Sequence, residues 1–157
     1  MTPENNTVDL IRLSDGDNTF RVRVLGRRSP GILPTHDLLD AEAVIESSFV
    51  NGRLDICFHP ADLESWSRIL DSLDVGRAAD WLDTGNGPVI KIDFPEDDPR
   101  LPVIQVEDTS ASGTSATIPI TAGEGWVEEQ RHRLNEVLQA WPSEVRRTSP
   151  GAYEWRR

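Results

Sequence analysis

Four side chains near the middle of the chain carry groups that could do chemistry together: Glu46, Asp55, Cys57 and His59. A thiol, an imidazole and two carboxylates could bind a transition metal, and a Cys–His pair could act as a nucleophile with its base. The spacing weakens both interpretations, because residues two apart on a strand lie ~6.5–7 Å apart, longer than a hydrogen bond. Cys57 is also the only cysteine, whereas a structural zinc site usually takes four Cys or His ligands. We therefore expect no catalytic residue, no metal and no cofactor.

The segment that must position these groups, residues 38–73, has the pattern strand, turn, strand, helix. Asn51-Gly52 is the residue pair typical of a type I′ hairpin turn, because both central residues of that turn need a positive φ. A turn at this pair predicts three facing pairs: Phe49 with Leu54, Ser47 with Ile56, and Ile45 with Phe58. The same register places Glu46 opposite Cys57 on the polar face.

Period-2 alternation predicts further strands at residues 8–14, 20–24, 89–94, 103–108 and 116–120. Apolar residues at helical spacing predict one helix from about Pro60 to Gly76 and another from about Trp126 to Trp141. Short turns join the strands, which favours an α+β fold: an antiparallel sheet of about seven strands with both helices packed on one face. Periodicity leaves open whether this sheet is open or curls into a partial barrel.

The length of 157 residues fits one domain, expected over residues 1–142. The remaining segment, residues 143–157, is expected to be a polar tail that could dock through Tyr153 and Trp155 onto this protein or onto another. No apolar run approaches the ~20 residues that cross a bilayer, and the first residues lack the apolar region of a signal peptide. We therefore expect a cytoplasmic protein.

The formal net charge of −11 limits the partners. Nucleic acids and anionic membranes attract basic surfaces, so the sequence argues against both. An acidic protein is either simply soluble or complementary to a basic partner.

A polar sheet face is the best candidate for recognition. Arg21, Arg23, Glu42, Glu46 and Asp55 are expected to share the face opposite the core. Such residues form either a mixed-charge recognition surface or a solvated exterior of cross-strand pairs. Tyr153 and Trp155 are the other candidates for partner binding.

Several segments resemble an uncharacterised family of unknown function found in GC-rich bacteria. They are residues 40–42 and 47–49, Gly52-Arg53-Leu54, residues 62–66, Gly113-Thr114-Ser115, Gly125-Trp126, and residues 149–155. The resemblance extends from about Leu10 to Trp155 and implies no activity or site residue. The order of elements is also similar to that of small bacterial immunity proteins, which neutralise toxins of neighbouring cells.

These observations favour a non-enzymatic, cytoplasmic protein-binding module, in the manner of an immunity protein that masks a basic partner. Two alternatives stay open at this point. One is a small-molecule sensor or carrier that uses a concavity beneath the helices. The other is a metal-dependent or thiol enzyme centred on Cys57 and His59.

Overall fold

A computed structural model describes residues 6–85 and 87–156. Over these residues the chain forms ten strands and two helices. The first sheet contains β1 (Val8–Ser14), β2 (Asn18–Arg27), β3 (Leu39–Ser47) and β4 (Asn51–Phe58), all antiparallel. After α1 (Pro60–Asp74), the second antiparallel sheet contains β5 (Ala79–Trp81), β6 (Val89–Asp93), β7 (Val103–Glu107) and β8 (Ser115–Pro119). Then follow α2 (Trp126–Ala140) and a separate hairpin of β9 (Val145–Ser149) and β10 (Ala152–Trp155).

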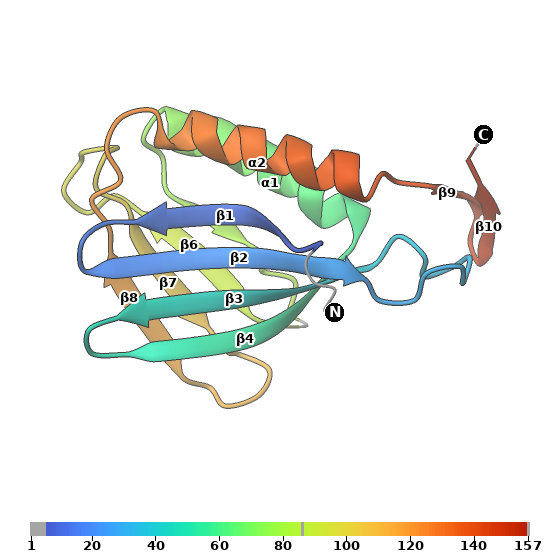
Figure 1. The fold of residues 1–157 in the computed structure, drawn as a ribbon, viewed down its shortest axis with the longest axis horizontal. Helices are drawn as coiled ribbons and strands as arrows, with labels where there is room; N and C mark the ends of the chain where they lie inside the picture. The colour runs from blue at the N-terminus through green and yellow to red at the C-terminus, as the bar shows by residue number, and fades with distance from the viewer. Residues whose placement is uncertain (1–5, 86, 157) are drawn as a thin grey trace.

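The α+β class and the two helices are as predicted, but the single sheet of about seven strands is wrong. Four strands before α1 and four after it pair only within their own group. Figure 1 shows the β1–β4 sheet in front of the β5–β8 sheet, with both helices along one side. Two sheets form because each has one apolar face, and each face covers the other. Residues 1–5 of the predicted domain and Arg157 of the predicted tail lie outside the described residues.

The core lies between the two sheets and beneath the helices. Alternate residues of each strand, such as Phe20 and Val22 on β2 and Ile90 and Ile92 on β6, are buried while their neighbours face outward. The Trp81 ring packs against both Phe58 and Trp66, with centroid distances of 5.1 and 4.8 Å, and so joins β5 to β4 and α1. Neither helix, over the residues described here, has the length and apolar character needed to cross a membrane.

The predicted register of the central hairpin is wrong. Ile45 faces Gly52 and Ala41 faces Ile56, so the turn lies at residues 47–50 and not at Asn51-Gly52. The Ser47 hydroxyl explains the difference, because it accepts hydrogen bonds from the amides of Phe49 and Val50 at 3.1 and 2.8 Å. The Ser47 amide in turn donates to the Val50 carbonyl at 3.0 Å. A serine side chain can stabilise a turn by bonding to the backbone of the next residues. Here the turn that Ser47 stabilises forms in place of a turn at Asn51-Gly52.

The error moves partners along the strand but leaves the faces unchanged. Ile45 was predicted to face Phe58 and in fact faces Gly52, a shift of an even number of residues. Even shifts keep every side chain on its own face because strands alternate with a period of two. Phe49, predicted to be inward, instead sits at the tip of the turn with 92% of its surface exposed.

Gln130 is the one fully buried polar side chain found in the described part of the chain, and it attaches α2 to the first sheet. Its Oε1 accepts a hydrogen bond from the Arg12 amide at 2.9 Å, and its Nε2 donates to the Trp126 carbonyl at 3.0 Å. Arg12 lies on β1, whose other edge pairs with β2, so this amide belongs to the outer edge of the sheet. The helix therefore satisfies a backbone group that would otherwise be buried without a partner.

Replacing Gln130 with Ala should lower the free energy of unfolding by about 1–3 kcal/mol, because the Arg12 amide then loses its side-chain partner. Urea denaturation followed by circular dichroism measures this. The matched control is Gln139→Ala, on an exposed position of the same helix. Equal stability of the two variants would contradict the role of the Gln130 amide.

Candidate functional site

The predicted polar face exists as the outer face of the β1–β4 sheet, and its charges lie in rows across the strands. One row, the arginine row, contains Arg12, Arg21 and Arg53 from β1, β2 and β4. The next row, the acidic row, contains Asp9, Arg23, Glu42 and Asp55, one residue from each strand in order. Rows of opposite sign lie side by side, which favours ion pairs between and within them.

The ion pairs of this face centre on the acidic row. Arg23 lies 3.6 Å from Asp9 and 4.0 Å from Glu42, and Arg53 lies 3.6 Å from Glu42. Glu42 is consequently only 13% exposed, so little of its carboxylate can reach a partner. Asp55 faces Glu42 across the strand pair and has no ion pair with any residue that the structure describes. The face as a whole has nearly balanced charge, and its pairs contribute little to stability.

Of the five residues predicted for this face, the structure brings together Arg23, Glu42 and Asp55 in the acidic row, with Arg21 in the neighbouring row. Glu46 lies further along, opposite Asn51, and is exposed. Sequence reasoning missed Asp9, Arg12 and Arg53. The sequence of β1 contains a signal for the first two, because Asp9 and Arg12 are charged residues among apolar ones. A β-bulge between Asp9 and Ile11 breaks the period-2 alternation, so the pattern does not show that both lie on the outer face.

Of the four predicted residues, Asp55, Cys57 and His59 line one cavity, whereas Glu46 lies apart from them, opposite Asn51. Cys57 faces Asp40 instead of Glu46, and His59 lies outside the strand, immediately before α1. The His59 amide donates to Asp62 Oδ2 at 2.8 Å, which caps the helix. Across the described residues, no three His, Cys, Asp or Glu side chains gather as a metal-binding group.

Cys57 nevertheless lines a cavity of about 470 Å³ at the end of β4. Its walls also include the charged or polar Arg28, Asp55, His59 and Asp62 and the apolar Ile56, Leu82 and Pro88. Burial, together with Asp40 and Asp62, raises the pKa of the Cys57 thiol against the opposing effect of Arg28. A raised pKa disfavours the thiolate, so Cys57 is poorly suited to act as a nucleophile near neutral pH.

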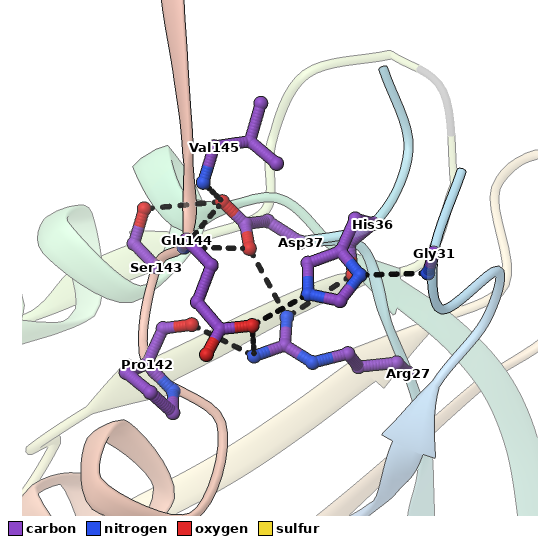
Figure 2. Close-up of polar contacts among 8 residues, drawn as sticks. All are labelled: Arg27, Gly31, His36, Asp37, Pro142, Ser143, Glu144 and Val145. Atoms are coloured by element: carbon purple, nitrogen blue, oxygen red, sulfur yellow. Dashed lines mark hydrogen bonds and ion pairs between the residues drawn. The ribbon is translucent and has the colours of Figure 1, made fainter. Parts of the chain in front are cut away.

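The C-terminal hairpin is held by the loop between β2 and β3. Figure 2 shows Asp37 and His36 of that loop directed at the start of the hairpin. Asp37 accepts hydrogen bonds from the amides of Glu144 and Val145, both at 3.0 Å, and forms a 3.0 Å ion pair with Arg27. Trp155, one of the predicted contact residues, packs edge-on against the His36 ring at 4.8 Å. Tyr153 lies on the same strand, opposite Arg147, and is half-buried.

Asp37 is the electrostatic centre of this contact. Burial alone would raise the pKa of its carboxyl, but the two backbone amides, the Ser143 hydroxyl and Arg27 outweigh burial and hold that pKa below its usual range. The ionised carboxylate is thus the form that binds the hairpin. Because the folded-state pKa is depressed, its stabilising effect is present above the unfolded-state pKa of ~3.9 and is lost as pH falls through the folded-state value.

The excess of negative over positive charge is larger in the other half of the molecule, because basic residues are fewer there. The segment from residue 79 to 122, which builds β5–β8, has eight acidic residues against one lysine and one arginine, whereas residues 8–58 have eight against six arginines. Both cations of the acidic segment are already paired, Lys91 with Glu107 at 3.4 Å and Arg100 with Asp98 at 3.1 Å. Asp80, Asp93 and Glu96 are exposed and have no ion pair within the described ranges.

Replacing Asp37 with Asn should detach the C-terminal hairpin at neutral pH, because it removes the charge that the two amides and Arg27 bind. The indole NMR resonance of Trp155 should then move to the position of a solvent-exposed tryptophan. The same movement is expected in the unchanged protein as pH falls through the depressed folded-state pKa of Asp37, below the ordinary value of ~3.9. The control is Asp74→Asn, at an exposed position of α1, which should leave the resonance in place. An unmoved Trp155 in the Asp37 variant would show that other contacts hold the hairpin.

Comparison with solved structures gives matches at low sequence identity. The plant transcriptional regulator PBF-2 matches with a TM-score of 0.53 and 11% identity, over 89% of this chain and 84% of that one. At this identity the match shows a shared fold. A chain from a guide-RNA-binding protein complex bound to a gRNA matches with a TM-score of 0.47 and 12% identity, over 87% of this chain and 91% of that one.

Comparison with curated proteins gives no match. A family model, by contrast, matches residues 8–142, from the first strand to the proline that follows α2. This range contains both four-stranded sheets and both helices. The chain therefore belongs to DUF5959, a family of unknown function.

Proposed function

We propose that this protein is a non-enzymatic binding module that holds a basic partner protein against its β5–β8 half. The observation that carries the proposal is the unequal division of charge between the two sheets. Residues 79–122 hold eight acidic groups and only two cations, both of which are paired within the segment. The unpaired carboxylates are therefore available to a partner.

The β1–β4 face is less suited to this role than its sequence suggests. Glu42 is held by Arg23 and Arg53 and is largely covered, so a partner would have to break existing ion pairs to reach it. A partner that binds Asp80, Asp93 and Glu96 does not have to break an ion pair among the described residues, because these three form none there. An acidic surface of this kind speeds the encounter with a basic partner and discriminates against acidic ones. It also opposes nucleic acids and anionic membranes as partners.

The order of strands and helices supports a more specific version of the proposal, an immunity-type protein that masks a basic toxin. Such a protein needs no catalytic group, because occupying the partner's surface is sufficient. The raised pKa of Cys57 and the separation of Glu46 from Cys57 and His59 also agree with a binding role.

The test compares three forms of the tagged protein in capture from a native lysate at low salt, with quantitative mass spectrometry. The acid-face variant carries Asp80→Asn, Asp93→Asn and Glu96→Gln. The control carries Glu64→Gln, Asp74→Asn and Glu136→Gln on the helices, which changes the net charge equally at exposed positions. The acid-face variant should bind its basic partner about tenfold more weakly, because it loses three charge contacts of roughly 0.5 kcal/mol each.

The unchanged protein and the control should capture the same partner to the same extent, and higher salt should weaken both. Equal loss in both variants would assign the effect to net charge and not to this surface. A captured partner that is acidic, or that binds all three forms equally, would contradict the proposal.

A further inference from the structure

The two edges of the β1–β4 sheet differ in whether another element covers them. The β1 edge is covered by α2 through Gln130. The β4 edge has no strand beside it among the residues that the structure describes. An uncovered edge presents a row of amides and carbonyls that another strand can pair with.

The charges along β4 are complementary to themselves. Arg53 and Asp55 are both exposed and lie two residues apart on the outer face. If a second β4 runs antiparallel across a two-fold axis at Leu54, Arg53 of each copy faces Asp55 of the other. Opposite charges directly across a strand pair are stabilising. Asp55 gains most from this, because its neighbour on β3 is the like-charged Glu42.

The apolar side of the edge fits the same pairing. Leu54 is half-buried on the inner face and lines an apolar groove of about 370 Å³ together with Val106 and Ala116 of the other sheet. In the pairing described above, Leu54 meets Leu54 of the second copy. The inner faces of both copies then coincide, because this register brings residues of the same face together.

The two ends of β4 also complement each other. At one end the turn holds Phe49 outward, 92% exposed, with its amide bonded to the Ser47 side chain. At the other end lies the cavity of about 470 Å³, whose lining combines the apolar Ile56, Leu82 and Pro88 with polar residues such as Arg28, His59 and Asp62. The same antiparallel register brings Phe49 of one copy opposite His59 of the other, at the mouth of that cavity. There the ring can contact the apolar residues of the cavity beside its polar ones, and exposed aromatic rings are enriched at protein interfaces.

We infer that the protein forms a two-fold dimer in which the β4 strands pair and join the two β1–β4 sheets into one. The interface is isologous, since each copy provides the same edge, the same ion pair and the same phenylalanine. This self-association is independent of the acidic β5–β8 surface and goes beyond the proposed binding function.

Charge reversal tests the pairing by analytical ultracentrifugation over a range of concentrations. Arg53→Asp alone places aspartates opposite one another, and Asp55→Arg alone does the same with arginines, so each should raise the dimer dissociation constant about tenfold or more. An equimolar mixture of the two variants should associate as tightly as the unchanged protein, because every facing pair is again opposite in sign. Rescue in the mixture cannot arise from a folding defect.

Phe49→Ser provides a second measurement and should also weaken the dimer about tenfold. Its control is Val75→Ser, another exposed apolar residue, located after α1 and away from β4. A protein that is monomeric at every concentration would overturn the inference. So would a dimer that neither charge variant weakens, or a mixture that fails to recover the association.

Discussion

The hydrogen bond from the Arg12 amide to the Gln130 side chain joins residues 118 positions apart, and much of the architecture follows from it. It fixes α2 over the edge of β1, and α1 then packs between α2 and the β4–β5 region. A polar group buried at this depth has to be paired, so the helix has one favourable position along the strand. The helix thereby covers the β1 edge of the first sheet, while the β4 edge has no strand beside it among the described residues.

The two sheets share one core but have different exteriors. On the outer face of β1–β4, arginines and carboxylates neutralise each other, as Glu42 does with Arg23 and Arg53. On the β5–β8 half the carboxylates exceed their two cations. This division gives the molecule two distinct surfaces for contact: a self-complementary edge at β4 and an acidic half. The C-terminal hairpin adds a third feature, since the carboxylate of Asp37, together with Arg27 and His36, attaches it to the body.

The alternation of apolar and polar residues was enough to predict most strands and the faces of the residues within them, though not that of Phe49, which lies in a turn. It could not predict which apolar faces meet, and for that reason one sheet was expected where two stack. The hairpin register failed because the Ser47 side chain closes a turn that Asn51-Gly52 was expected to form. β5 is only three residues long, and β9 carries exposed Arg, Thr and Ser with no apolar alternation, so neither has a periodic signal.

The candidate site, too, could be predicted from the sequence only in part. Arg21, Arg23, Glu42 and Asp55 could be assigned to one face because period two fixes faces. Their ion pairs depend on the register and on the β1 bulge, which local sequence does not reveal. The contact between Asp37 and the Val145 amide spans 108 positions and carries no local pattern at all.

The unequal charge of the two sheets is the central claim, and it can be measured directly. Amide relaxation in NMR spectra at low salt would be compared in the presence of a cationic and an anionic paramagnetic cosolute. We expect amides of β5–β8 and their loops to relax markedly faster with the cationic probe, and those of β1–β4 to respond similarly to both. A cationic preference spread evenly over both sheets would contradict the division of charge on which the proposed function rests.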